Sequence, residues 1–235
     1  MRSKKIVVLT GAGISAESGI STFRDKNGLW EGYDVMEVAS PSGWQKNMDL
    51  VLEFYNQRRR QLCEVLPNAA HFNIVDLEKK FDVKIITQNV DDLHERAGSS
   101  QVLHLHGELL KARSTGNDRY IVEWKKDLLR GDVCPEGYQL RPHIVWFGEE
   151  VPMMYQAANI IAYADILIIV GTSLQVYPAA GLIQYAADTC KLYYIDPRPA
   201  VNYELSLFKN KEIIAEKASI GVSELVDKLM SDEIN

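Results

Sequence analysis

Residues Lys5–Gly19 read KIVVLTGAGISAESG, and this stretch decides the fold. Its aliphatic residues at 6–9 follow one another without polar alternation, which is typical of a strand buried on both faces of a parallel sheet. Glycines follow directly at 11 and 13, where a strand-to-helix turn can hold a phosphate with backbone N–H groups. The third glycine of the usual dinucleotide fingerprint is absent, and no acidic strand end follows about 20 residues later. An ordinary dehydrogenase site therefore fits poorly, and a plain strand-to-helix turn stays an alternative.

Strands and helices are expected to alternate along much of the chain. Short β-branched runs predict buried strands, and helical patterns lie between them. The expected strands are Lys5–Leu9, Lys84–Thr87, Ile166–Val170 and Leu192–Ile195, and the expected helices are Ala70–Lys80, Val151–Ala164 and Ala179–Thr189. This alternation predicts an α/β fold with a doubly wound, mainly parallel, Rossmann-like sheet.

Two stretches, residues 26–66 and 111–143, interrupt that alternation. The first holds a loop and a strong amphipathic helix, and the second is polar with weak strand signals. We expect both to form a smaller inserted module. Residues 1–25, 67–110 and 144–235 would then form the large Rossmann-like domain. A crevice between two such parts is a common place for a ligand.

The composition excludes several classes of protein. The net charge of −6 disfavours nonspecific binding to nucleic acid or to acidic membranes, and no basic stripe with interleaved aromatic residues is present. Cys63, Cys134 and Cys190 are too scattered for a disulfide framework, which favours a reducing compartment. The first apolar run is too short for a signal peptide, and no run has membrane length. We expect a soluble, cytoplasmic protein without a nucleic-acid or membrane partner.

Five ordered segments make the functional prediction specific. They are GAGISAESGISTFR at 11–24, TQNVD at 87–91, LHG at 105–107, VWFGE at 145–149 and GTSLQVYPAA at 171–180. Together they closely resemble the motifs of the sirtuins, and the resemblance spans nearly the whole chain, 1–235, as one catalytic unit. It implies an NAD-dependent protein-lysine deacylase. NAD would be consumed as a co-substrate, with release of nicotinamide and 2′-O-acyl-ADP-ribose.

The resemblance also implies roles for individual residues. His106 would be the general base, which suits an imidazole whose ordinary pKa lies near neutrality, and Asn89 would share the catalytic work. Asp91 would accept from the nicotinamide amide, and Asp196 from the adenine ribose. His71, His94 and His143 are expected to be structural. The implied cofactor-binding residues are Gly11, Ala12, Gly13, Ser15, Glu17, Phe23, Arg24, Gln88, Asn89, Val90, Asp91, Gly171, Thr172, Ser173, Asp196 and Ala218.

The segment Val145–Glu149 is expected to be a short exposed edge strand. An extended substrate peptide would pair with it through backbone hydrogen bonds and so place the modified lysine in the tunnel. The substrate-binding residues expected in this segment are Val145, Phe147, Gly148 and Glu149.

The helix predicted at Asp49–Leu66 carries the inference about the acyl group. At about 100° per residue, one apolar stripe holds Val51, Phe54, Tyr55, Leu62, Val65 and Leu66. Arg58 falls within this stripe and Arg60 falls opposite. An inward arginine needs an anionic partner, and Tyr55 offers a hydroxyl three residues earlier. The pair resembles that of sirtuins that remove succinyl, malonyl or glutaryl groups, and Ala39 sits where those relatives keep a small residue. Three consecutive solvated arginines are the alternative.

One feature departs from the family. Most sirtuins carry four zinc-binding cysteines between the HG motif and the substrate segment, but residues 111–143 hold only Cys134 and His143 as such ligands. A closed zinc site needs four ligands, so we expect no zinc and no other metal.

Other functions stay open at this point. A mono-ADP-ribosyltransferase or an NAD glycohydrolase would use the same cleft, and a non-catalytic NAD-sensing module is a further alternative. The sequence does not fix the oligomeric state, for which a monomer is one option.

Overall fold

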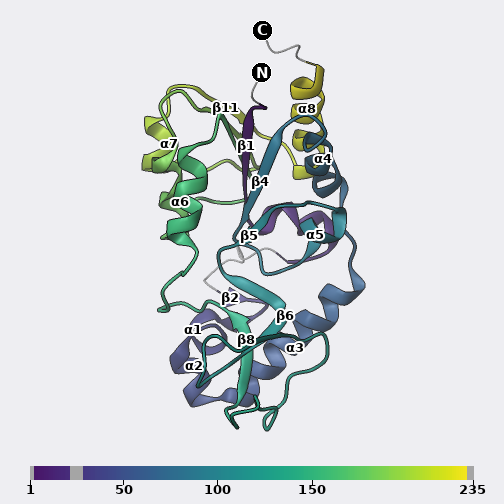
Figure 1. Ribbon diagram of the computed structural model, residues 1–235, viewed down its shortest axis with the longest axis vertical. Helices are drawn as coiled ribbons and strands as arrows, with labels where there is room; N and C mark the ends of the chain where they lie inside the picture. The colour runs from purple at the N-terminus through teal and green to yellow at the C-terminus, as the bar shows by residue number, and fades with distance from the viewer. Residues whose placement is uncertain (1–2, 22–28, 232–235) are drawn as a thin grey trace.

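The computed structural model describes residues 3–21 and 29–231. A parallel six-stranded sheet has the order β11-β10-β9-β1-β4-β5. Its strands are β1 (Lys5–Thr10), β4 (Asp82–Thr87), β5 (Val102–His104), β9 (Ile166–Val170), β10 (Lys191–Ile195) and β11 (Lys211–Ile214). The four predicted strands are therefore confirmed, and the fold is the expected α/β, Rossmann-like type. The start of β1 and the end of the last helix (Ala218–Ser231) lie at the end of the molecule that holds this sheet (Figure 1).

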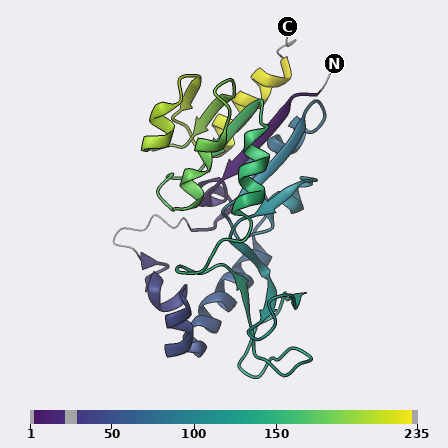
Figure 2. The same cartoon turned by 60° about the vertical axis from the view of Figure 1, so that its left-hand side comes forward.

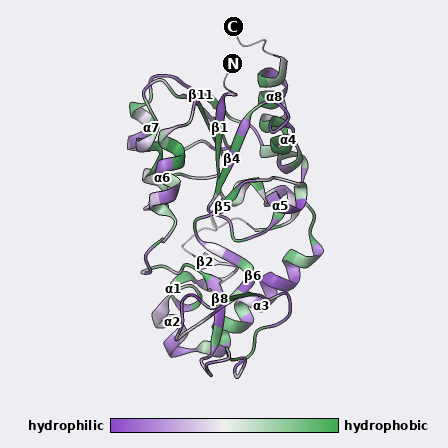
Figure 3. Ribbon diagram, in the orientation of Figure 1, coloured by the Kyte–Doolittle hydropathy of each residue, from purple (hydrophilic) through white to green (hydrophobic). Residues whose placement is uncertain are grey.

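The two faces of the sheet carry separate apolar cores because successive side chains alternate along each strand. Ile6 and Val8 pack with helices α4 (Ala69–Leu77) and α8 (Ala218–Ser231). Val7 and Leu9 pack on the other face with α6 (Met154–Ala162) and the 3₁₀ helix η3 (Ala179–Tyr185). Figure 3 shows the central strands as predominantly hydrophobic. Burial on both faces explains why these strands lack polar alternation.

The smaller module lies at the opposite end of the molecule (Figures 1 and 2). An antiparallel sheet has the order β7-β6-β8. Its strands are β6 (Gly107–Ser114), β7 (Ile121–Glu123) and β8 (Leu140–Ile144). The module also contains a hairpin and three helices, namely β2 (Leu29–Trp30), β3 (Tyr33–Asp34), α1 (Val35–Val38), α2 (Pro41–Lys46) and α3 (Met48–Glu64). The antiparallel sheet begins at Gly107. The domain boundaries from the sequence stay predictions.

Two predicted helices need correction. The segment predicted as a helix at 179–189 forms only the 3₁₀ helix η3, which ends at Tyr185 because Ala186 is extended. Short connectors between larger elements are commonly 3₁₀ helices. The helix predicted at 49–66 ends at Glu64, since Val65 is extended and Leu66 precedes a proline. Leu66 is 72% exposed, so it does not belong to the buried stripe.

The remaining connections are short. Helix α5 (Leu93–Ala97) follows β4, and α7 (Tyr203–Leu207) lies between β10 and β11. The helices of the described residues include none with both the length and the apolar character needed to span a membrane.

Candidate functional site

A cavity of about 490 Å³ extends from the carboxyl ends of β1, β4, β9 and β10 to the smaller module. Open α/β sheets place ligands at this edge. We call its sheet-side lining the sheet half: Gly11, Ala12, Gly13, Ser15, Gln88, Asn89, Asp91, Gly171, Thr172, Ser173, Asp196 and Ala218. We call its other end the module half: Trp30, Ala39, Tyr55, Arg58 and Trp146. His106 lines the same cavity and is counted in neither half.

Two glycine loops interlock in the sheet half. The N–H of Gly11 donates to Val170 O at 3.0 Å, and that of Gly13 donates to Gly171 O at 2.8 Å. A Cβ on Gly13 would lie 2.6 Å from the Cα of Gly171. A Cβ on Gly171, whose φ is +62°, would lie 2.4 Å from Ile14 N. Glycine is therefore required at positions 13 and 171 mainly because the two loops contact each other. The sequence pattern did not reveal this reason.

These contacts limit how the first loop can hold a phosphate. The N–H groups of Gly11, Gly13, Ile14 and Ser15 already donate to backbone carbonyls. The helix after the loop is the short 3₁₀ helix η1 (Ala12–Ile14), and the N–H groups of its residues Gly13 and Ile14 are already bonded to Gly171 O and Gly11 O. Among the described residues, no backbone carbonyl accepts from the N–H of Ala12, which therefore is the candidate donor of this loop.

The second loop adds hydroxyl groups. Thr172 Oγ1 accepts from Gln88 Nε2 at 3.1 Å and from the N–H of Leu174 at 3.3 Å, so it fixes the turn. Ser173 is half-buried on the cavity wall. Both residues line the position that the sequence assigned to phosphates.

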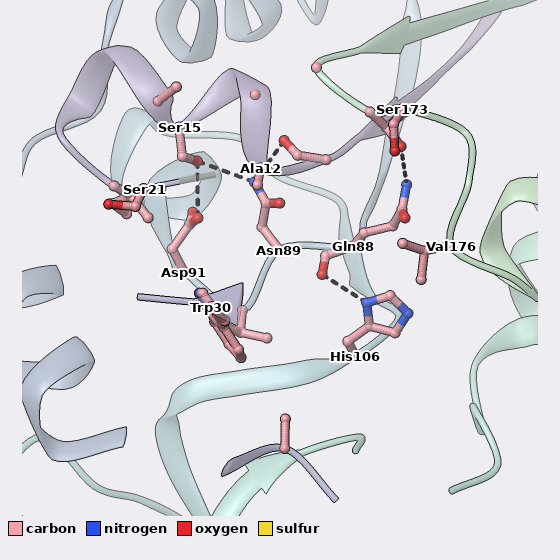
Figure 4. A pocket seen from close by; sticks show the side chains of 18 of the residues that line it. Ala12, Ser15, Ser21, Trp30, Gln88, Asn89, Asp91, His106, Ser173 and Val176 are labelled. Atoms are coloured by element: carbon pink, nitrogen blue, oxygen red, sulfur yellow. Dashed lines mark hydrogen bonds between the residues drawn. The ribbon is translucent and has the colours of Figure 1, made fainter. Parts of the chain in front are cut away.

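A chain of hydrogen bonds joins Asn89, Ser15 and Asp91 (Figure 4). Asn89 Nδ2 donates to Ser15 Oγ at 3.2 Å and to Gly11 O at the same distance. The Ser15 hydroxyl donates to Asp91 Oδ2 at 3.0 Å. This chain holds both side chains against the first loop.

Asp91 is buried, which raises the pKa of its carboxyl to about 6 although bonds from Leu93 N–H and Ser15 favour the charged form. A buried carboxyl in this range is ionised at neutral pH but only by a small margin. It is suited to accept from an uncharged N–H group of a ligand. Perturbed groups of this kind gather at functional sites.

The geometry defines the tautomer of His106. Its Nδ1 lies 2.9 Å from Gln88 O. A carbonyl can only accept, so Nδ1 carries the proton and Nε2 is left as the acceptor. Figure 4 shows Nε2 on the side of the ring away from Gln88. Burial lowers the pKa of His106, partly offset by the bond to Gln88. The neutral ring is therefore the dominant form at neutral pH.

His104 has a different environment although it is only two residues away. Its Nδ1 lies 3.2 Å from Asn89 O, and its Nε2 lies 2.7 Å from Glu95 Oε1. Burial opposes its charge, but the bond to Glu95 and the Glu95 charge raise the pKa of His104. His104 does not line the cavity.

The far end of the sheet half is formed by β10 and α8. Asp196 is 3% exposed and its Oδ1 accepts from Arg198 N–H at 2.8 Å. Ala218 opens α8 and is buried on the cavity wall. Glu17 also lines the cavity, but its carboxylate accepts from the N–H and hydroxyl of Ser219, in the first turn of α8. That bond gives Glu17 a structural function beside the one implied by the sequence.

Helix α3 positions Tyr55 and Arg58 in the module half. Tyr55 is fully buried, and its hydroxyl accepts from Trp146 Nε1–H at 3.0 Å. Arg58 donates to Phe54 O at 2.5 Å, and its guanidinium carbon lies 3.4 Å from the Phe54 ring centroid. Burial lowers the pKa of Arg58. Arg58 forms no ion pair with a carboxylate within residues 3–21 and 29–231.

The three neighbouring arginines differ more than the sequence indicated. Arg60 is exposed and pairs with Glu53 and Asp127. Arg59 is fully buried, where its Nη1 donates to Asn56 Oδ1 and its Nε to Leu109 O. Sequence spacing did not identify Arg59 as buried because its partner Leu109 comes from a strand 50 residues away. Arg59 ties α3 to β6 and leaves Arg58 to the cavity.

The segment Val145–Glu149 is not an edge strand. Strand β8 ends at Ile144, and the chain turns at Gly148, whose φ is +90°. The Glu149 carboxylate accepts from the Trp146 N–H at 2.8 Å and so closes the turn. Val145 N–H donates to His106 O and Phe147 N–H to Ala39 O. Val145, Phe147, Gly148 and Glu149 nevertheless line the cavity.

Phe23 and Arg24 lie outside the described residues, and their functions stay predictions. The described residues include no group of three or more His, Cys, Asp or Glu side chains placed to hold a metal. Cys134 packs instead in an apolar cluster with Leu52, Ala112, Leu128 and Leu140.

The chain is similar to known proteins over nearly its whole length. Residues 11–178 match the model of the Sir2 family. A protein of Helicobacter pylori named NAD-dependent protein deacylase is 57% identical over 227 residues, which cover 97% of this chain and 96% of that one. A protein of the same name from Bacteroides thetaiotaomicron is 51% identical over 97% of this chain and 98% of its own length. A crystal structure of a Sir2 homologue with NAD aligns with a TM-score of 0.85 at 38% identity, covering 97% of this chain and 90% of that chain.

Proposed function

The chain belongs to the Sir2 family and is an NAD-dependent protein deacylase; we propose that it removes succinyl and malonyl groups, as well as acetyl groups, from lysine side chains. The observation that carries the proposal is the placement of Arg58 and Tyr55 in the cavity that His106 also lines. A cationic fork and a hydroxyl at one end of the cavity suit a small carboxylate.

The sheet half fits NAD. The contact between the glycine loops brings backbone to the cavity wall, where Ala12 N–H and Ser173 would face the phosphates. Asp196, buried at the end of β10, would accept from hydroxyls of the adenine ribose. NAD supplies the ribose to which the acyl group passes. The cavity is continuous from Asp196 past His106 to Tyr55, so co-substrate and acyl-lysine would meet near His106.

His106 would act as the base. Its Nε2 is the free acceptor of a ring whose Nδ1 proton is held by Gln88 O, so it would take a proton from a ribose hydroxyl without first changing tautomer. Asp91, ionised near neutrality and held by Ser15, would accept from the nicotinamide amide. Asp91 is buried and His106 is partly buried, which would limit the access of water to the reacting centre.

The environment of Arg58 supports the acidic specificity. Burial disfavours its charge, and the rings of Trp30 and Phe54 lie near its guanidinium. An anionic ligand would offset the free energy that the guanidinium loses when it is removed from water. An acetyl group offers no carboxylate, so it would gain nothing from Arg58 and would be processed less efficiently. Cytoplasmic location and the lack of nucleic-acid or membrane partners stay predictions.

Acetyl-, malonyl- and succinyl-lysine peptides of one sequence, assayed with and without NAD, test the proposal. Charge-assisted hydrogen bonds to the acyl carboxylate predict a kcat/KM about 10- to 100-fold higher for succinyl than for acetyl peptide. Nicotinamide, free-lysine peptide and acyl-ADP-ribose should form in equal amounts. Equal rates for the three peptides would contradict the acidic specificity. ADP-ribosylated peptide, or nicotinamide release without deacylation, would instead indicate the transferase or glycohydrolase alternatives.

A further inference from the structure

We infer that Trp146 determines the direction of the Tyr55 hydroxyl and, through it, the preference of the acyl pocket for a carboxylate; the inference rests on the proposed function. Trp146 is 2% exposed, and its indole Nε1–H donates to Tyr55 Oη at 3.0 Å. The two rings are stacked at 29° with centroids 6.4 Å apart. Trp146 also lines the cavity, but the N–H of its side chain is bonded to Tyr55. Trp146 is therefore a positioning residue for carboxylate recognition, which it would affect through Tyr55.

The donor and acceptor roles in this bond are fixed by chemistry. An indole N–H can only donate, so the Tyr55 oxygen must accept at that position. The hydroxyl hydrogen is then turned away from Trp146 and remains available as a donor. A buried donor without an acceptor costs free energy, and a carboxylate at the end of an acyl chain supplies that acceptor. An acetyl group ends in a methyl and cannot.

Trp146 itself is held from several sides. The guanidinium carbon of Arg141 lies 3.2 Å from the Trp146 ring centroid. Arg141 also bonds the Glu149 carboxylate at 2.6 Å, and Glu149 accepts from the backbone N–H of Trp146. Arg113, paired with Arg141 across β6 and β8, contacts the same carboxylate at 3.1 Å. Two strands of the smaller module therefore fix the indole and leave it little freedom to release Tyr55.

The same turn also contacts the pocket wall. Phe147 N–H donates to the carbonyl of Ala39 at 2.9 Å, and Ala39 lines the cavity. Phenylalanine at position 146 would fill much of the same space and keep the stacking, but it has no N–H. The substitution Trp146→Phe therefore isolates the hydrogen bond from the packing.

The test is a double-mutant cycle on the ratio of kcat/KM for succinyl to that for acetyl peptide. Trp146→Phe should lower this ratio about 3- to 10-fold, through a higher KM for the succinyl peptide. In the Tyr55→Phe background, Trp146→Phe should change the ratio by less than about twofold, because the two residues act as one unit. Trp44→Phe is the matched control, since Trp44 packs against Trp146 without lining the cavity, and should leave the ratio unchanged.

The outcomes separate this inference from the proposed function. A wild-type enzyme without a succinyl preference would overturn both. Two outcomes would overturn the inference alone. One is a Trp146→Phe variant that keeps the full wild-type succinyl preference. The other is a Trp146→Phe substitution that lowers the succinyl-to-acetyl ratio equally in the wild-type and Tyr55→Phe backgrounds.

A second measurement covers the case in which Trp146→Phe does not fold. The indole ¹H–¹⁵N resonance of Trp146, assigned in the wild-type enzyme, should move upfield in Tyr55→Phe as the hydrogen bond is lost. It should also respond more to a succinyl-lysine peptide than to an acetyl-lysine peptide. A resonance that Tyr55→Phe leaves unmoved would contradict the inference.

Discussion

The two halves of the cavity are built in different ways. The sheet half is made largely of backbone, where loops from β1 and β9 pack so closely that a Cβ on either glycine partner would collide. The module half is made of side chains from α3 and the turn after β8, and their direction depends on hydrogen bonds such as that from Trp146 to Tyr55. Backbone contacts tolerate little substitution, whereas side chains can be exchanged. We therefore propose that the sheet half together with His106 carries the chemistry and that the module half sets the acyl specificity.

The largest effect is expected at the junction of the halves. Replacing His106 by Tyr removes the proposed base while the surrounding backbone contacts stay, and should lower kcat about 10²- to 10⁴-fold for every acyl peptide. Nicotinamide release and peptide deacylation measure the loss. His143→Asn is the control, because His143 lies outside the cavity. Turnover of His106→Tyr within tenfold of wild type would refute its role.

A selective effect is expected in the module half. Arg58→Met should lower kcat/KM for succinyl peptide about 10- to 100-fold and affect acetyl peptide far less, because in the proposed function only an acidic acyl chain would contact the guanidinium. Arg60→Met, on the exposed face of the same helix, controls for the loss of a positive charge. An equal fall for both peptides would show that Arg58 does not recognise the carboxylate.

An intermediate effect is expected in the sheet half. Gly171→Ala places a Cβ against the first loop and should weaken NAD binding by about tenfold or more, with destabilisation of at least about 1–3 kcal/mol from the strained backbone. Calorimetry and thermal melting measure both. Gly137→Ala, also at positive φ but with nothing within 4 Å, should show the backbone cost only. NAD affinity that is unchanged in Gly171→Ala would argue against the interlocked loops as the NAD-binding element.

A buried histidine near the sheet half should make the folded protein sensitive to acid. This residue is His71, and burial lowers its pKa to about 4. Between pH about 6.5 and 4 the unfolded chain takes up a proton that the folded chain does not, so stability falls as pH falls, by about 1–3 kcal/mol from this residue. Urea unfolding at several pH values measures the slope. His71→Gln, which can retain the bond to Asn68 N–H, should flatten it; an unchanged slope would assign the acid sensitivity to other groups such as His94.

The smallest effect is expected from metal removal. The outer part of the smaller module packs around Leu52, Leu128, Cys134 and Leu140, and we expect chelation to change the melting temperature by less than about 1 °C. Elemental analysis should find zinc well below one atom per chain. A one-to-one content, or a marked loss of stability on chelation, would contradict the zinc-free prediction.

The sequence predicted the sheet half better than the module half, for a physical reason. Continuous apolar runs followed by glycines identify β1 and β9 from neighbouring residues alone. The burial of Arg59 and the turn at Val145–Glu149 depend on partners far along the chain, namely Leu109 for Arg59 and Arg113 for Glu149. Local patterns carry no information about such contacts. The interlock of Gly13 with Gly171 was missed for the same reason, although both glycines were identified.

The most direct test of the division between the halves is a calorimetric titration of Arg58→Met with NAD. If specificity resides in the module half and NAD binding in the sheet half, the variant should bind NAD within about twofold of wild type while its succinyl preference is lost. A loss of NAD affinity as large as the loss of succinyl activity would contradict the division and show that the cavity works as one unit.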